Sequence, residues 1–403
     1  MHEHNISMDK GMPKINSLWQ AAILASSHFL NDIFTSILSP LLPLLIENYS
    51  LSKFEAGLMA ALVSWPSVLQ PIFGRLGDKT NLKKYIFLFP LITGTFMSLI
   101  GVAPNIGVIA GSLLIAGISS ACFHAVAPPI AGKISGAHSG KGLSLWMIGG
   151  ELGFALGPIL IIAFVNSFSL KSTPILIIFA ALASILQYFR LNKIDEIKNH
   201  IPVQYRSTKS SFKAIAPMLI PILFVAASRS LINSSTNVYI PTYLTERGSN
   251  LWLAGTALSL IMVGSIFGTI VGGIYNDKIG GKPILFVSII GSSLFFFIFL
   301  YTQSAVQIVA LFITGFFAGM YLPVALTMVQ DYSPENRSFA NGIYLAFLFT
   351  IGALSNMLIG YLYDQFGGQF TFILSGIVSL LGVIFTLFIP AKHSAIEKEK
   401  SEA

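Results

Sequence analysis

Apolar residues in this chain fall into long runs separated by short polar stretches. The runs are about 18 to 25 residues long, the length that a helix needs to cross ~30 Å of hydrocarbon. We expect twelve membrane-spanning helices, at Leu18–Ile46, Phe54–Phe73, Tyr85–Ala103, Gly107–Ile130, Leu143–Val165, Pro174–Phe189, Ile215–Leu244, Leu251–Tyr275, Pro283–Tyr301, Val306–Val329, Phe339–Tyr363 and Phe370–Ile389.

A polar stretch from Arg190 to Lys213 interrupts this pattern after the sixth run. The sequence therefore predicts an all-α polytopic membrane protein with two six-helix repeats. Its parts are an N-terminal half over 1–190, a cytoplasmic linker over 191–213 and a C-terminal half over 214–403 that ends in a short cytoplasmic tail. The first run is too long for a signal peptide, and we expect it to be retained as a helix.

Composition and charge support this threading. The chain is 54% hydrophobic and only 10% charged, whereas soluble domains contain about 25% charged residues. With the N-terminus inside, 20 of the 24 Lys and Arg residues lie in inner segments and three in outer loops, as expected because basic residues accumulate on the cytoplasmic side. We expect a multi-pass protein of the inner (plasma) membrane with both termini cytoplasmic.

The same distribution explains the net charge of +7 without a nucleic-acid partner. Cys122 is the one cysteine, which excludes a disulfide within one chain and gives no cysteine-based metal cluster. The sequence also contains no nucleotide-binding loop, nucleophile elbow or zinc-ligand spacing. We therefore expect no enzyme activity, no cofactor and no metal, and energy must come from an ion gradient.

A short basic loop occurs at the same place in each half. Gly74-Arg75-Leu76-Gly77-Asp78-Lys79 follows the second helix, Gly273-Ile274-Tyr275-Asn276-Asp277-Lys278-Ile279-Gly280 follows the eighth, and Asp277 lies 199 residues after Asp78. This repeated loop resembles the signature of the major facilitator superfamily, which implies two six-helix halves and transport by alternating access. The resemblance implies a conformational latch at Gly74, Asp78, Lys79, Gly273, Asp277, Lys278 and Gly280, where the glycine allows helices to approach closely. The alternative is a surface loop that obeys only the charge rule.

The fifth helix carries Gly149-Gly150-Glu151-Leu152-Gly153-Phe154-Ala155-Leu156-Gly157-Pro158. This element is similar to the Gly-x-x-x-Gly-Pro element of drug/proton antiporters. Together with Ser27–Asp32 in the first helix and Phe123-His124 in the fourth, it resembles the fosmidomycin-resistance branch of the superfamily. That resemblance implies proton-driven export. Gly153, Gly157 and Pro158 are interpreted first as helix-packing residues, with a seal against leak as the alternative.

Charged groups within the spans are the candidate coupling residues, since each is costly in a bilayer. His28 and Asp32, at i and i+4, share a helical face in the middle of the first span. Glu151 is either a second protonation site or a packed carboxylate. His124 either relays protons or serves as a neutral hydrogen-bonding residue.

Arg229 lies at the middle of the seventh span, with Asn233 and Asn237 at helical spacing. Arg229, Asn233 and Asn237, with Asn31 of the first helix, are the candidate substrate-binding residues, and an anionic solute would suit Arg229. Because the first and seventh helices occupy matching positions, Asp32 and Arg229 are expected to face each other. The alternatives for Arg229 are a structural ion pair and a snorkelling side chain.

These features predict a proton-coupled secondary transporter that exports a drug or an anionic metabolite. Its expected partners are a small-molecule substrate, protons and the lipid bilayer, and we expect a monomer. The alternatives are uptake or facilitated transport of a sugar or organic acid, and a membrane sensor or channel. A sensor or channel would accumulate nothing against a gradient.

Overall fold

The structure is a computed structural model that describes residues 15–79, 86–134, 139–191, 211–332 and 337–390. Helix accounts for nearly all of these residues. The elements are α1 (Ile15–Thr35), α2 (Leu38–Tyr49), α3 (Lys53–Ser64), η1 (Trp65–Leu69), α4 (Gln70–Lys79), α5 (Leu88–Leu99), η3 (Ile100–Val102), α6 (Ile106–Ile134), α7 (Ser139–Phe168), η5 (Leu170–Ile175), α8 (Leu176–Leu191), α10 (Ser211–Ser234), η6 (Ser235–Tyr239), α11 (Ile240–Glu246), α12 (Leu251–Ile279), α13 (Gly281–Tyr301), α14 (Ser304–Gly319), α15 (Tyr321–Tyr332) and α16 (Arg337–Leu387).

The prediction of twelve spans is confirmed. Ten helical segments of the described chain are long and apolar enough to cross a membrane, and Leu88–Val102 is a shorter apolar helix that supplies a further crossing. The segment Gly342–Leu387 has 46 residues, about twice the length of one crossing. It bends at Gly367, whose φ of 77° is outside the helical range, and so it supplies two crossings.

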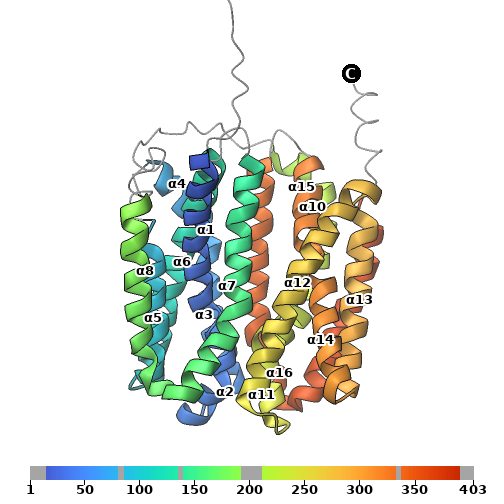
Figure 1. Cartoon of the computed structure of the whole chain (residues 1–403). Helices are drawn as coiled ribbons and strands as arrows, with labels where there is room; N and C mark the ends of the chain where they lie inside the picture. Colours follow the sequence, from blue (N-terminus) through green and yellow to red (C-terminus); the bar gives the residue numbers. More distant parts are fainter. Residues whose placement is uncertain (1–14, 80–85, 135–138, 192–210, 333–336, 391–403) are drawn as a thin grey trace, which may run out of the picture.

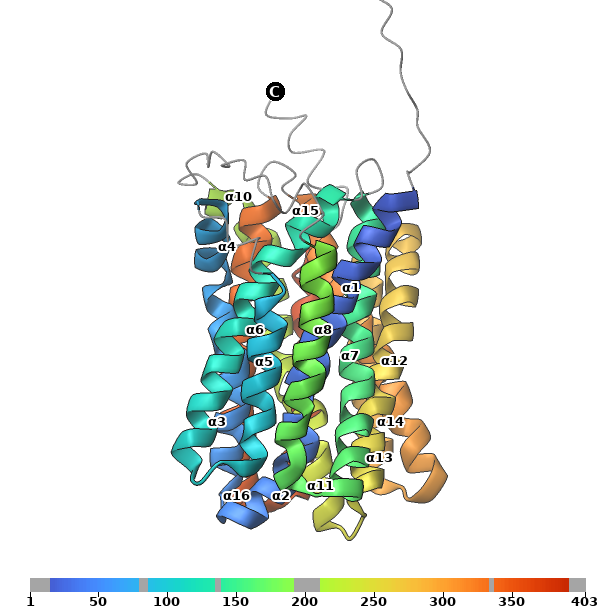
Figure 2. The same cartoon turned by 60° about the vertical axis from the view of Figure 1, so that its left-hand side comes forward.

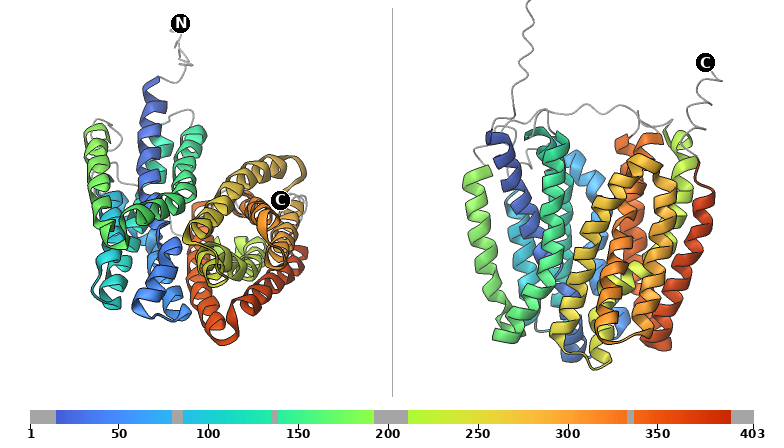
Figure 3. Two further views of the ribbon diagram at one scale, coloured as in Figure 1. Left: turned by 60° about the horizontal axis from the view of Figure 1, so that its bottom comes forward. Right: turned by 45° about the vertical axis from the view of Figure 1, so that its right-hand side comes forward.

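The helices form two bundles that stand side by side (Figures 1 and 3). Elements α1 to α8 make the first bundle, which Figure 2 brings forward, and α10 to α16 make the second. We call the end where α1 and α10 begin the near end, and the end with the α2–α3 and α11–α12 connections the far end. The predicted linker over 191–213 lies almost wholly outside the described residues, so its boundaries stay a prediction.

The first and seventh spans are both interrupted, and at matching positions. The α1–α2 break begins at Ser36, and the π turn η6 begins at Ser235, which is 199 residues later, the same offset as between the two loops. Breaks of this kind in membrane helices are tolerated where the backbone is buried in protein, and they often occur at functional positions. The interruptions mark these two helices as the elements to search for a site.

Hydrogen bonds and an ion pair join the two bundles at the far end. Asp364 of α16 accepts hydrogen bonds from the backbone nitrogens of Lys53 and Phe54, at 2.9 and 2.8 Å. Lys53 Nζ lies 2.7 Å from a Glu246 carboxylate oxygen. The Tyr239 hydroxyl donates to the Lys53 carbonyl at 2.9 Å. The far end is therefore closed by polar contacts that converge on the start of α3.

At the near end, no close approach at the two loops is seen among the residues that the structure describes. A Cβ atom built on Gly74 or on Gly273 would meet nothing within 4 Å. The bundles are joined at the opposite end in this conformation, and the latch at Gly74 stays a prediction. The same test on Gly264 and Gly268 of α12 finds the backbone of Phe312 and Phe316 in contact.

Candidate functional site

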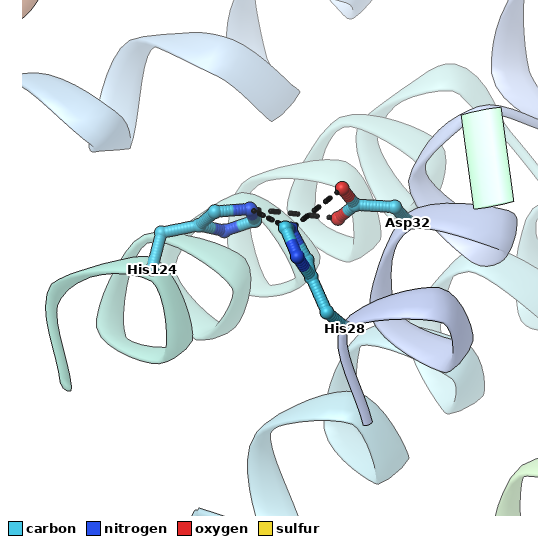
Figure 4. Close-up of side chains that lie close together, drawn as sticks. All are labelled: His28, Asp32 and His124. Carbon is cyan, nitrogen blue, oxygen red and sulfur yellow. Dashed lines mark hydrogen bonds and ion pairs between the residues drawn. The ribbon is translucent and has the colours of Figure 1, made fainter. Parts of the chain in front are cut away.

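Three titratable side chains converge inside the first bundle. His28 and Asp32 project from α1, and His124 projects toward them from α6 (Figure 4). His28 Nε2 lies 3.0 Å from Asp32 Oδ2 and 3.1 Å from His124 Nε2, and His124 Nε2 lies 3.6 Å from Asp32 Oδ1. We call these three residues the His–Asp–His cluster. The sequence places His28 beside Asp32, and the fold adds His124.

Neighbouring groups hold the cluster in place. The His28 ring stacks on Trp146 of α7, with ring centroids 3.7 Å apart. Asn31 Nδ2 donates to Asp32 Oδ1 at 2.8 Å and to Ser120 Oγ at 2.9 Å. Asn31, expected to bind substrate, therefore supports the carboxylate of the cluster.

The cluster needs at least one proton between its three members. His28 Nδ1 is 2.8 Å from the Trp146 carbonyl, and His124 Nδ1 is 2.9 Å from the Ser120 carbonyl. A carbonyl only accepts hydrogen bonds, so both Nδ1 atoms carry hydrogen, and a neutral ring then has only a lone pair at Nε2. Two such lone pairs and the Asp32 carboxylate would be three acceptors facing one another. A shared proton turns this repulsion into hydrogen bonds.

Exposure distinguishes the three members. The side chains of His28 and Asp32 are 7% and 4% exposed, whereas that of His124 is 26% exposed. His124 is thus the member of the cluster that is most accessible from the surroundings. The ligand atoms of the three residues lie within 4.8 Å of one another, a donor set that would also fit a divalent metal, but here they already bond to each other.

Glycines of α7 let this helix lie against α1. Cβ atoms on Gly149, Gly153 and Gly157 would clash with α1 backbone or side-chain atoms between Ala25 and Ser36. Gly150 faces the cluster itself, and a Cβ there would contact the His28 ring and lie 2.7 Å from Asp32 Oδ2. Pro158 lies on another face of α7, where its carbonyl oxygen is near Gly255 of α12.

Glu151 lies outside the cluster. It is half-buried, and it makes no hydrogen bond or ion pair with another described side chain. Seven residues, or two helical turns, separate it from Pro158, so it lies on the face of α7 that meets α12. The structure therefore separates Glu151 from the other three proton-coupling candidates.

Arg229 lies in the second bundle, and the residue as a whole is 8% exposed. The guanidinium carbon lies 4.1 Å from the centre of the Tyr321 ring. Arg229 Nη2 donates to the Ala318 carbonyl at 3.2 Å, while Nε is enclosed and has no hydrogen-bond partner. No acidic side chain of the described chain forms an ion pair with it.

The expected pairing of Asp32 with Arg229 is therefore wrong. Asp32 pairs with imidazoles of its own bundle, and Arg229 stacks on a tyrosine of its own bundle. Similar depth in the sequence predicted that the two residues would meet, but each contacts groups of its own bundle instead. The alternative in which these two residues tie the halves together as an ion pair fails for the same reason.

The other polar candidates of the seventh span, Asn233 of α10 and Asn237 of η6, lie at helical spacing after Arg229. Asn237 Nδ2 donates to Asn233 Oδ1 at 2.8 Å, and Asn233 is exposed. Polar residues of the eleventh span bond between helices instead, since Ser355 donates to Ser230 and Asn356 accepts from Ser234.

For three residues of the expected latch, the structure describes the backbone but not the side chains. Asp78 and Lys79 close α4, and Asp277 lies near the end of α12, but the side chains of these three residues lie outside the described part. Lys278 Nζ lies 5.5 Å from the centre of the Tyr275 ring. Gly280 has a φ of 83°, a left-handed conformation that glycine adopts without strain.

Sequence reasoning missed Trp146, Gly150 and Tyr321 as site residues. Trp146 and Gly150 are one turn apart and lie beside Gly149, Gly153 and Gly157 on α7. The spacing of these glycines could therefore have indicated that Trp146 and Gly150 also face α1. No comparable signal exists for Tyr321, because its contact with Arg229 joins two helices whose relative rotation the sequence does not give.

Comparison with known proteins agrees with this architecture. The family model of the Major Facilitator Superfamily matches residues 24–305 and 253–403. The fosmidomycin resistance protein of Escherichia coli K12 is 24% identical over 379 residues, which are 91% of each chain. The multidrug resistance efflux pump PmrA homolog of Lactococcus lactis is 22% identical and covers 81% of this chain and 83% of its own.

Solved structures show the same fold at lower identity. A bacterial homolog of the human lysosomal transporter Spinster superposes with a TM-score of 0.76 at 16% identity, covering 94% of this chain and 97% of its own. A D-xylose–proton symporter gives a TM-score of 0.72 at 17% identity, covering 93% and 98%. With twelve spans in two bundles and a family match across nearly the whole chain, this protein is a transporter of the Major Facilitator Superfamily.

Proposed function

We propose that this transporter exports small molecules in exchange for protons, and that the His–Asp–His cluster carries the proton. The observation that supports this most directly is the convergence of three acceptor atoms that a shared proton turns into a hydrogen-bonded cluster. The resistance and efflux relatives support export.

The cluster has the charge range that a coupling site needs. Without a shared proton its net charge is −1, with one it is neutral, and with two it is +1, because two imidazoles and one carboxylate titrate together. A buried site strongly prefers the neutral form, since ions are costly away from water. One bound proton is therefore the resting condition of the cluster, and gain or loss of a proton changes the energy of the first bundle.

In the proposed cycle, the near end faces the cytoplasm, as the distribution of basic residues indicates. The conformation described here, joined at the far end, then delivers protons inward through His124 and receives solute. Rocking of the two bundles exposes the same sites to the outside. Glu151, on the face toward α12, is a second protonation candidate, and a single chain holds every group that the cycle uses.

The test is substrate-evoked proton flux in reconstituted vesicles, measured with a pH-sensitive dye while a panel that includes fosmidomycin, anionic metabolites and sugars is added. We expect flux with the intact chain and none with Asp32→Asn, which cannot hold the charge. The control is Glu47→Gln, the same chemical change at an exposed carboxylate of α2, which should behave as the intact chain does.

Other outcomes point elsewhere. Normal flux in Asp32→Asn would remove coupling from the cluster and favour Glu151. Solute movement without proton flux would indicate facilitated transport, and co-movement of solute and protons in one direction would indicate uptake. No movement of any solute would favour the sensor or channel interpretation.

A further inference from the structure

The second bundle contains a buried cation without a partner of opposite charge. Arg229 is always protonated at physiological pH, and its guanidinium is held among Tyr321, Ala318 and the rest of α10. Tyr321 and Tyr344, whose hydroxyls bond to each other at 3.0 Å, are neutral hydroxyl groups and do not balance the charge. A buried guanidinium without an anion is unfavourable, so its retention needs an explanation.

The contacts of Arg229 fix its orientation and leave a binding edge unused. The Tyr321 ring covers one face of the guanidinium, and the Ala318 carbonyl accepts one hydrogen bond from Nη2. Nε has no partner although it is enclosed. The Nε edge of a guanidinium is one of the two edges that bind a carboxylate or phosphate through paired hydrogen bonds.

The surroundings of Arg229 favour a solute over a lipid. Asn233, one turn further along the same face, is exposed although it lies in the middle of a membrane span. A primary amide facing lipid tails would be costly, so this face of α10 is turned toward the space between helices. A ligand in this space would contact the Arg229 guanidinium and the neighbouring amide groups of Asn233 and Asn237.

We propose that Arg229, oriented by Tyr321, is the binding site for an oxyanion, and that the exported solutes are small molecules bearing a carboxylate, phosphate or related group. This inference rests on the proposed export function, whose proton site lies in the other bundle. Proton and solute then occupy separate bundles, and their exchange is coupled through the motion of the bundles, which carries the solute in one half-cycle and the proton in the other.

Binding of anions tests this site without any transport measurement. Thermal unfolding of the purified protein is measured in neutral phosphatidylcholine nanodiscs with inorganic phosphate, fosmidomycin or benzoate as the probe. Two controls are used: benzamide, which is the neutral counterpart of benzoate, and chloride at equal ionic strength. We expect Tm to rise with at least one oxyanion and not with benzamide. Arg229→Gln should weaken the apparent Kd roughly 10-fold or more, the usual effect of losing a charge-assisted hydrogen bond.

Two controls separate a binding role from a structural one. Arg247→Gln removes an arginine that also lies over a tyrosine ring, Tyr243, but at the far end, and it should leave anion binding intact. Arg229→Gln without ligand should unfold at the same temperature as the intact chain or higher, because it removes an unpaired buried charge. A large fall in this basal Tm would assign Arg229 a structural role and overturn the proposal.

The remaining outcomes are equally decisive. The measurement is repeated in nanodiscs that contain phosphatidylglycerol. No response of the intact protein to any soluble oxyanion, or a rise in Tm only with this anionic lipid, would exclude a soluble anion as the ligand. Anion binding that persists in Asp32→Asn while proton flux disappears supports both proposals. Binding lost in Arg229→Gln with no proton flux in any variant would keep the anion site and reject proton coupling.

Discussion

At the scale of single residues, the proton site depends on atoms that are not themselves titratable. The carbonyls of Trp146 and Ser120 orient the two imidazoles by accepting from Nδ1. The Trp146 ring then holds His28 by stacking at 3.7 Å. Disturbing this frame should impair proton binding as effectively as removing a titratable group.

Gly150→Ala tests this frame without changing any charge. The new methyl group would contact the His28 ring and Asp32 Oδ2, and overpacking of this kind typically costs 1–3 kcal/mol. We expect the protein to remain folded with a lower Tm and to lose about tenfold or more of its substrate-evoked proton flux. Gly111→Ala, where a Cβ meets nothing within 4 Å, is the matched control, and equal flux in both variants would contradict the role of the frame.

The sequence could predict half of the cluster but not all of it. His28 and Asp32 are i and i+4 on one helix, so their meeting follows from helical geometry. His124 joins them from α6, and Arg229 stays apart, because these outcomes depend on how each helix is rotated about its axis. Hydropathy indicates that a residue is in the membrane and about how deep, but it does not give that rotation.

At the scale of helices, glycines have two distinct uses. Gly268 of α12 would place a Cβ against the Phe316 backbone, so it permits close packing within the second bundle. Gly74 and Gly273 have open space around them in this conformation. The same residue type thus appears where helices touch now and where, by the family resemblance, they touch in another state.

Gly74→Ala distinguishes these two uses. Alanine favours helix over glycine by about 0.5–1 kcal/mol, so Tm should stay the same or rise slightly, while transport should fall if the latch closes on this face in the opposite conformation. Gly268→Ala should instead lower Tm, by overpacking. Full transport by Gly74→Ala would leave the loop with no role beyond its charge.

The number and limits of the spans were predictable because apolar runs have the length of the bilayer. What the runs did not show is that the first and seventh spans are interrupted at Ser36 and Ser235. Neither residue breaks helices by itself, and the interruption follows from contacts between helices. Ser36 Oγ lies 3.5 Å from the Gly153 carbonyl of α7, and Ser235 Oγ donates to Ser375 of α16.

At the scale of the whole molecule, the contacts at the far end are the ones that the proposed cycle must break, and in this sense the far end is its proposed gate. Helix α3 begins there, and its first backbone N–H groups have no partners within the helix. The Ser52 side chain accepts from the Glu55 nitrogen, and Asp364 of the other bundle accepts from Lys53 and Phe54. Two of these three N–H groups are therefore capped from across the interface, and both bonds must be lost when the far end opens.

Asp364→Ala should shift the balance toward opening at the far end. Loss of a capping carboxylate costs about 1 kcal/mol, which is roughly a fivefold change in the ratio of the two states. Spin labels on Asn48→Cys and Gln365→Cys in a Cys122→Ser background would report it by pulsed electron resonance, as growth of a longer distance. Glu47→Gln is the control, and an unchanged distance distribution in Asp364→Ala would mean that the cap does not hold the gate.

The π turn η6, which directly follows α10, would connect the proposed solute site to the proposed gate. Tyr239, the last residue of that turn, donates both to Lys53 and to the Asn356 carbonyl, and it lies ten residues after Arg229, about 15 Å along one helix. A π turn is wider than an α turn, so tightening it would rotate Tyr239 about the helix axis and withdraw its hydroxyl from Lys53. Local rewinding of a single helix would then be enough to release the far end when the solute site fills, without any contact between solute and gate.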